Sequence, residues 1–278
     1  MKLFPTLAIA IMALPSLAQA ADQDVTIAGT QRPIAATITL PDGDGPFPFV
    51  VMYHGTGSNR HEAGNGYDLL APKLAEAGIA SARFDFAGNG DSPVDYVEYR
   101  LSTGVQDGLD VIAYMRGLDQ IDDARLGVLG WSQGGTIAML TAARTPDVKS
   151  LVTWAGAVDL SQMAANQLAE AEQNGYAVLT FDWRTPLNLS LGWFHEVRDT
   201  DVAKELAAYK GAVLAIAGSK DDVVDPSVTD TILTAAPTTD KHKEIIEGAD
   251  HTFNIFSGDM SAFDTLSQIT VDQFKKAL

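Results

Sequence analysis

The stretch Leu126-Gly127-Val128-Leu129-Gly130-Trp131-Ser132-Gln133-Gly134-Gly135 decides the fold of this chain. Its apolar start predicts a buried strand, and the Ala-rich segment 133–143 predicts a helix. A tight strand-to-helix turn holds such a serine in a strained backbone conformation, with its hydroxyl above the sheet. Glycines two residues before and after the serine are needed because side chains there would collide across the turn. The pattern therefore predicts that Ser132 is a nucleophile.

On both sides of this turn, short apolar runs alternate with helical patterns. Later runs are apolar on both faces, as in a parallel sheet covered by helices. The first two strands flank a turn with Gly29 and Pro33 and are predicted to form an antiparallel hairpin. This order predicts an α/β fold with a doubly wound, mostly parallel, eight-stranded sheet. We predict strands at 25–28, 35–40, 49–53, 80–84, 126–129, 151–154, 212–217 and 243–247, and helices at 67–77, 103–116, 133–143, 225–234 and 262–278.

One segment interrupts the alternation. Between Trp154 and Ala212 the sequence predicts no strand of the main sheet. A structureless loop of that length is uncommon in a compact domain. We therefore expect a small cap, inserted at about residues 158–208 of a single domain that spans 21–278.

A second loop is expected to supply a backbone N–H donor for the oxyanion that forms during the reaction. His54-Gly55-Thr56-Gly57 follows an apolar strand, and a nucleophilic serine on such a turn needs one amide from an earlier strand-end loop. We expect the Thr56 N–H to pair with the Gln133 N–H in an oxyanion hole. His54 itself is expected to orient the loop through its ring nitrogens.

The acid and the base are predicted after the serine, in the chain order that accompanies such a turn. Asp221 and Asp222 follow an apolar strand; we favour Asp221 as the acid, with Asp222 as the alternative. His251 follows the last strand, on the edge of the sheet where ligands bind. His195 lies in the insertion and His242 in a charged run, so His251 is the expected base.

These motifs together resemble the α/β-hydrolase family over nearly the whole chain after residue 20, and most of all its branch of feruloyl and cinnamoyl esterases. The resemblance implies that Asp85 and Ser92 form a structural turn and that a small cap follows the sixth strand. It is carried by residues 54–57, 74–80 and 83–92, the turn at Ser132, the acid turn at Asp221 and residues 250–253.

The predicted mechanism is that of a serine ester hydrolase. His251 removes the Ser132 proton during attack, Asp221 orients the imidazole, and water later releases the acyl group. The substrate is expected to be a small to medium carboxylic ester, and no metal or organic cofactor is needed. A peptidase or amidase would use the same triad, and a non-catalytic binding protein could share the fold.

Aromatic residues around the predicted site are candidates for an acyl or aryl pocket. Trp131, beside the nucleophile, is the expected substrate-binding residue. Phe181, Trp183, Trp193 and Phe194, in the insertion, either line that pocket or pack the cap onto the domain.

Composition excludes several function classes. The chain has 19 Lys and Arg against 36 Asp and Glu, a net charge of −17, which argues against nucleic acid and anionic lipid as partners. It has no cysteine, which excludes thiol nucleophiles and thiolate metal sites. Residues 1–20 predict a signal peptide cleaved after Ala20, so we expect a secreted or periplasmic protein without membrane insertion. The sequence leaves the oligomeric state open.

Overall fold

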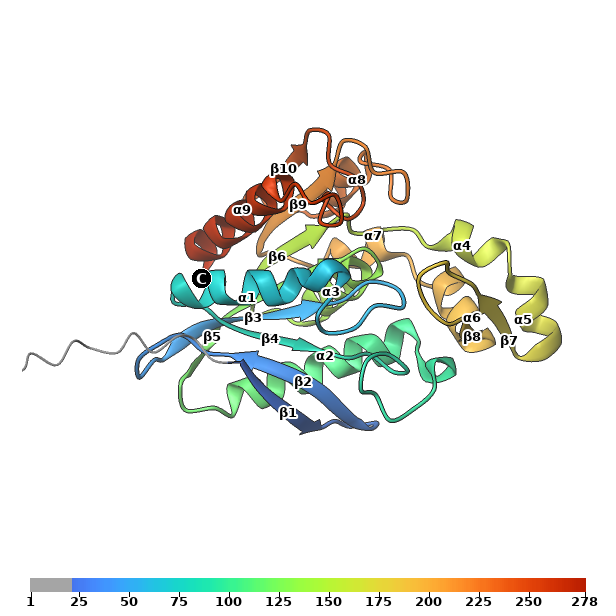
Figure 1. Cartoon of the computed structure of the whole chain (residues 1–278), viewed down its shortest axis with the longest axis horizontal. Helices are drawn as coiled ribbons and strands as arrows, with labels where there is room; N and C mark the ends of the chain where they lie inside the picture. The colour runs from blue at the N-terminus through green and yellow to red at the C-terminus, as the bar shows by residue number, and fades with distance from the viewer. Residues whose placement is uncertain (1–21) are drawn as a thin grey trace, which may run out of the picture.

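The computed structural model describes residues 22–278, so the predicted signal peptide at 1–20 lies outside the described residues. Eight strands form one sheet in the order β1-β2-β4-β3-β5-β6-β9-β10, which confirms the predicted sheet (Figure 1). The pairs β1–β2 and β2–β4 are antiparallel, and the other neighbours are parallel. The strands are β1 (Asp22–Ala28), β2 (Pro33–Thr39), β3 (Phe47–Tyr53), β4 (Ala80–Phe84), β5 (Ile121–Trp131), β6 (Val148–Trp154), β9 (Ala212–Gly218) and β10 (Lys241–Ile246).

Helices cover both faces of this sheet. Because successive side chains of a strand point to opposite faces, Val51 packs in the cluster that includes residues of α2 and α3, and Val50 in the cluster that includes residues of α1 and α9. Figure 1 shows α1 and α9 on the viewer's side of the sheet. The helices are α1 (Gly66–Glu76), α2 (Leu101–Arg116), α3 (Gln133–Arg144), α8 (Val228–Ala235) and α9 (Ser261–Ala277), with short 3₁₀ turns η1 (Ala63–Asn65) and η2 (Tyr96–Glu98).

The predicted helix at 225–234 begins later, at Val228. The Asp225 side chain accepts a hydrogen bond from the Ser227 N–H at 2.8 Å, and a turn precedes the helix. Aspartate competes for nearby backbone N–H groups in this way, which favours turns and caps over helix interiors. The other predicted boundaries agree with the structure to within a few residues, apart from β5, which begins at Ile121.

The segment between β6 and β9 folds into helices and a separate small sheet. Two short helices are followed by an antiparallel hairpin and then by two further helices. In Figure 1 the carboxyl ends of β3 and β4 point toward the side where this segment lies. Its elements are α4 (Ser161–Ala165), α5 (Leu168–Asn174), β7 (Tyr176–Leu179), β8 (Leu187–Ser190), α6 (Leu191–Asp199) and α7 (Val202–Leu206).

Aromatic side chains attach this segment to the domain. Trp193 and Phe194, from α6, are buried in the large core cluster that also contains α2 and α3. Trp183 is 64% exposed, with its ring 5.0 Å from that of Phe181. The two residues of α6 therefore pack the segment onto the domain, whereas Trp183 is exposed to solvent.

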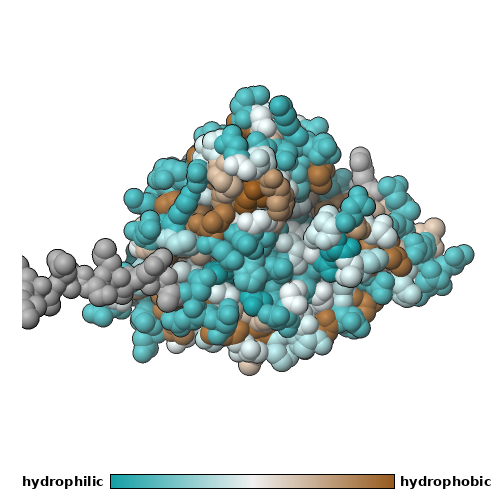
Figure 2. Space-filling view, in the orientation of Figure 1, coloured by the Kyte–Doolittle hydropathy of each residue, from teal (hydrophilic) through white to brown (hydrophobic). Residues whose placement is uncertain are grey.

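The surface shown in Figure 2 is mostly hydrophilic, with small separate apolar areas. No helix within residues 22–278 is long and apolar enough to cross a membrane.

Candidate active site

Ser132 lies between β5 and α3, with φ 54° and ψ −122°. Such a backbone conformation costs about 1–3 kcal/mol and persists only where the surroundings impose it. A Cβ on Gly130 would lie 2.1 Å from the Gly134 oxygen, and one on Gly134 would lie 2.0 Å from the Tyr53 oxygen. The Ser132 N–H donates to the Trp154 carbonyl at 2.9 Å. The turn expected from the sequence is present, and close backbone contacts require both glycines.

The two loops expected to supply the oxyanion hole lie together. Thr56 Oγ1 donates to Gln133 Oε1 at 3.1 Å. The Gln133 N–H opens α3, where the first amides have no acceptor within the helix. The Thr56 N–H donates to no backbone or side-chain acceptor in the described part of the chain. Neither amide has an acceptor within residues 22–278, and their role in an oxyanion hole stays a prediction.

His54 has both ring nitrogens occupied. Its Nδ1 is 2.8 Å from the Gly55 oxygen, and its Nε2 accepts the Phe86 N–H at 3.1 Å. These partners assign the proton to Nδ1. Burial lowers the pKa of His54 to about 4, so the ring is neutral at ordinary pH. The arrangement agrees with a structural role, because neither nitrogen is available for proton transfer.

His251 and Asp221 form the acid–base pair. The His251 Nδ1 is 2.8 Å from Asp221 Oδ2, and the Asp221 side chain is fully buried. Asp221 Oδ1 accepts the N–H groups of Val223 and Val224 at 2.9 and 2.8 Å. Asp222 is exposed. The structure therefore brings Asp221, rather than Asp222, to the histidine.

Trp131 does not line a pocket. Its side chain is only 2% exposed, and its ring packs against Tyr67, Trp154 and Phe253. Its Nε1 donates to the His251 carbonyl at 3.1 Å. The side chain points below the turn into the core, so we expect Trp131 to hold the histidine loop beside the serine loop rather than to bind substrate.

No hydrogen bond joins Ser132 to His251 among residues 22–278.

Glu62 is a buried carboxylate that sequence reasoning missed. Its Oε2 accepts the Gly55 N–H at 2.5 Å, and its Oε1 accepts the Ala63 N–H at 2.8 Å. A Cβ on Gly55 would lie 3.4 Å from Ser132 Cβ and 3.5 Å from Glu62 Oε2, so the carboxylate lies near the serine. Burial raises the pKa of Glu62. A lone glutamate in a polar loop carries no sequence pattern that predicts this burial.

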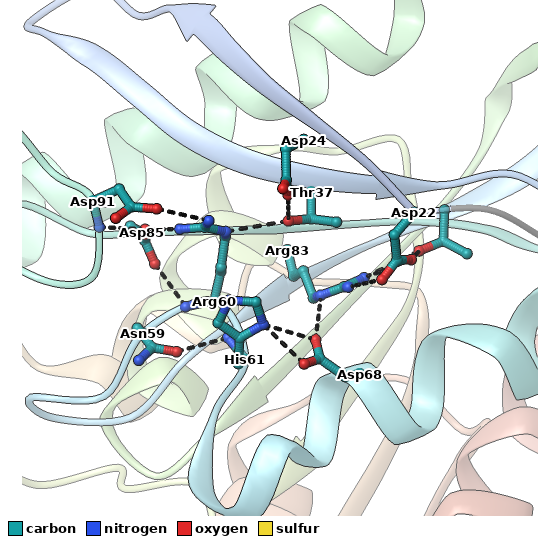
Figure 3. A network of polar contacts seen from close by, with 11 residues as sticks. Asp22, Asp24, Thr37, Asn59, Arg60, His61, Asp68, Arg83, Asp85 and Asp91 are labelled. Atoms are coloured by element: carbon teal, nitrogen blue, oxygen red, sulfur yellow. Dashed lines mark hydrogen bonds and ion pairs between the residues drawn. The ribbon is translucent and has the colours of Figure 1, made fainter.

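The base of the loop that carries Thr56 is held by an ionic network (Figure 3). The Arg60 N–H donates to Asp85 Oδ1 at 2.7 Å, and its guanidinium pairs with Asp85 and, at 2.7 Å, with Asp91. The Ser92 hydroxyl accepts the Gly88 N–H at 3.0 Å. Asp85 and Ser92 therefore organise a turn, as the resemblance implied.

Arg184, from the inserted segment, is a second residue that the sequence did not reveal. Its Nη1 donates to the Gly57 carbonyl and, at 3.2 Å, to Asn89 Oδ1. Gly57 directly follows Thr56, so this contact brings a guanidinium beside the predicted oxyanion hole.

The polar residues of this site include no metal-binding set: no group of three or more His, Cys, Asp or Glu side chains that could hold an ion occurs in the described chain.

A mostly parallel eight-stranded sheet, with a serine on a strand-to-helix turn and an Asp–His pair on two strand-end loops, is the architecture of an α/β-hydrolase. Solved structures of that class match it. The DcsB complex with its substrate analogue has a TM-score of 0.77 and 17% identity, and covers 93% of this chain and 100% of its own. Est1E from Butyrivibrio proteoclasticus, with ferulic acid bound, has a TM-score of 0.74 and 21% identity, over 90% of this chain and 98% of its own.

The family model described as X-Pro dipeptidyl-peptidase (S15 family) matches residues 32–210, and the chain belongs to that family. Two curated relatives are similar over shorter regions. The 2,6-dihydropseudooxynicotine hydrolase of Paenarthrobacter nicotinovorans is 31% identical over 46% of this chain and 33% of its own. A pimeloyl-(acyl-carrier protein) methyl ester esterase of Neisseria meningitidis is 38% identical over 37% of this chain and 34% of its own. Each alignment spans about a third of the relative's length.

Proposed function

We propose that this protein hydrolyses carboxylic esters of small to medium size through an acyl-enzyme on Ser132. The observation that carries the proposal is the strained serine turn, joined through the Trp131 hydrogen bond to the loop of the His251–Asp221 pair. The names of the relatives support an ester, since one is a methyl ester esterase and Est1E binds ferulic acid.

The residues would act in sequence. Asp221 accepts the His251 Nδ1–H, which leaves Nε2 as the base that removes the Ser132 proton during attack on the ester carbonyl. The amides of Thr56 and Gln133 donate to the oxyanion as it forms. His251 then protonates the leaving alcohol, and water attacks the acyl-enzyme with the same base.

Hydrolysis of p-nitrophenyl esters from acetate to laurate, with methyl ferulate alongside, tests the proposal. The wild type should hydrolyse short esters or the ferulate, and Ser132→Ala should lose about 10⁴-fold or more in kcat/KM. Unchanged circular dichroism of the variant is the control for folding. No turnover of any ester by folded wild type would refute the proposal, and failure of a fluorophosphonate to label Ser132 would favour a non-catalytic binding protein.

The family description favours a second candidate, cleavage of peptides or amides by the same residues. A matched comparison of Gly-Pro-p-nitroanilide with a p-nitrophenyl ester separates the two. Faster turnover of the anilide would replace the esterase proposal with a peptidase.

We also propose export, with cleavage after Ala20. Mass spectrometry of the protein produced with its own N-terminus tests this, because the mature chain would begin at Ala21. An intact Met1 in the recovered protein would contradict it.

A further inference from the structure

Arg184 holds its position through neutral groups. Its Nε donates to the Thr185 carbonyl at 3.1 Å, and its Nη1 to Gly57 and Asn89. The two hydrogens of Nη1 and the one of Nε are thereby used, whereas Nη2 has no partner among residues 22–278. The side chain is fixed, yet one edge of its guanidinium stays available.

Its charge is uncompensated, in contrast to most arginines of the chain. Asp182, two residues away, is exposed and forms no ion pair with any described residue. Burial lowers the pKa of Arg184, as expected where no carboxylate offsets the loss of hydration. Seven other arginines pair with carboxylates: Arg32, Arg60, Arg83, Arg116, Arg125, Arg144 and Arg198.

This cation also lies beside the predicted oxyanion hole. Its bond to Gly57 brings it next to Thr56, whose hydroxyl contacts the residue after Ser132. The chain has a net charge of −17, which repels anions. A fixed guanidinium without an acidic partner makes the electrostatic potential locally positive, and so attracts an anion. Guanidinium groups bind carboxylates with charge-assisted hydrogen bonds, which are stronger than neutral ones.

We propose that Arg184 binds a free carboxylate of the substrate, so that the preferred esters carry an anionic carboxylate near the bond that is cleaved. This inference rests on the proposed ester hydrolysis. The Nη2 edge would donate to the carboxylate while Nη1 keeps the inserted segment on the Gly57 loop.

Two matched substrate pairs test the inference. In 4-acetoxybenzoate and 4-acetoxybenzamide the charge difference lies on the leaving group; in monoethyl succinate and ethyl butanoate it lies on the acyl group. In at least one pair the wild type should prefer the acid, and Arg184→Gln should reduce that preference about 10- to 100-fold. Arg198→Gln is the matched control, because Arg198 is an exposed arginine of the same inserted segment that pairs only with Asp199.

The outcomes separate this inference from the proposed function. Hydrolysis of the neutral esters with no preference for acids, or a preference that survives in Arg184→Gln, would overturn the role of Arg184 and leave the esterase in place. If no ester is hydrolysed, calorimetric binding of 4-hydroxybenzoate and succinate to Ser132→Ala decides. Binding that Arg184→Gln abolishes supports the carboxylate site, whereas absent or unchanged binding refutes it.

Discussion

The strand ends of the main sheet and the inserted segment hold their polar residues in different ways. At the strand ends, backbone contacts position the groups: Gly130 and Gly134 leave no room for a side chain, and Asp221 is bound by two amides. In the inserted segment, single side chains such as Arg184 reach across to the domain. Close backbone packing has few alternative arrangements, whereas a long side chain can be exchanged without altering the fold. The strand ends are therefore suited to hold the catalytic groups, and the inserted segment is suited to select the substrate.

The largest expected effect is the loss of activity when the carboxylate that holds His251 is replaced. Asp221→Asn should lower kcat about 10⁴-fold, because the amide cannot hold the same His251 tautomer. Asp222→Asn, at an exposed neighbour, should change kcat less than about twofold. Steady-state kinetics on the best p-nitrophenyl ester measures both. Equal losses in the two variants would contradict the assignment.

Glycine substitutions compare the two regions by stability. Gly134→Ala places a Cβ against the Tyr53 carbonyl and should destabilise the protein by more than about 3 kcal/mol. Gly175→Ala, at φ 81° in the inserted segment with no atom nearby, should cost only about 1 kcal/mol. Urea unfolding measures both free energies. A Gly134→Ala protein as stable as Gly175→Ala would show that the turn is less tightly constrained than its contacts indicate.

The buried histidine at the end of β3 makes the strand-end region sensitive to acid. The pKa of His54 is lowered to about 4 from an ordinary 6.5, so the unfolded chain binds a proton in this range that the folded chain does not. His54 therefore contributes stability above about pH 6.5 that is lost as the pH falls toward 4, in total about 3 kcal/mol.

The measurement is the free energy of unfolding from pH 4 to 7. His54→Gln should lose part of the wild-type slope, whatever its absolute stability. His195→Gln, at an exposed position of the inserted segment, should keep the slope. An unchanged slope in His54→Gln would show that His54 titrates alike in the folded and unfolded chains.

The smallest effect concerns a helix cap in the inserted segment. The Ser190 hydroxyl accepts the Trp193 N–H at 3.1 Å at the start of α6, so Ser190→Ala should cost about 1 kcal/mol. Ser227 precedes α8 without such a bond, and Ser227→Ala should cost less than about 0.5 kcal/mol. Thermal unfolding compares the two variants. A larger loss at Ser227 would contradict the role of the cap.

The sequence by itself determined the sheet and the turn at Ser132, because hydrophobic periodicity and paired glycines are local properties. It also identified His251 and Asp221 as candidates for the base and the acid, because each follows an apolar strand. It left Asp221 and Asp222 open, since the choice depends on which carboxylate the strand end turns toward His251. Trp131 was assigned to a pocket because adjacency to the serine does not reveal which side of the turn a side chain takes.

Only the tertiary structure decided the surroundings of the site. Glu62 is buried because the loop folds its carboxylate onto the amides of Gly55 and Ala63. Arg184 is beside Thr56 because a segment more than a hundred residues further along the chain folds back over the strand ends. Such contacts join residues far apart in the chain, so no local pattern encodes them. Periodicity and turn chemistry specify the elements; long-range packing decides which polar groups meet at the serine.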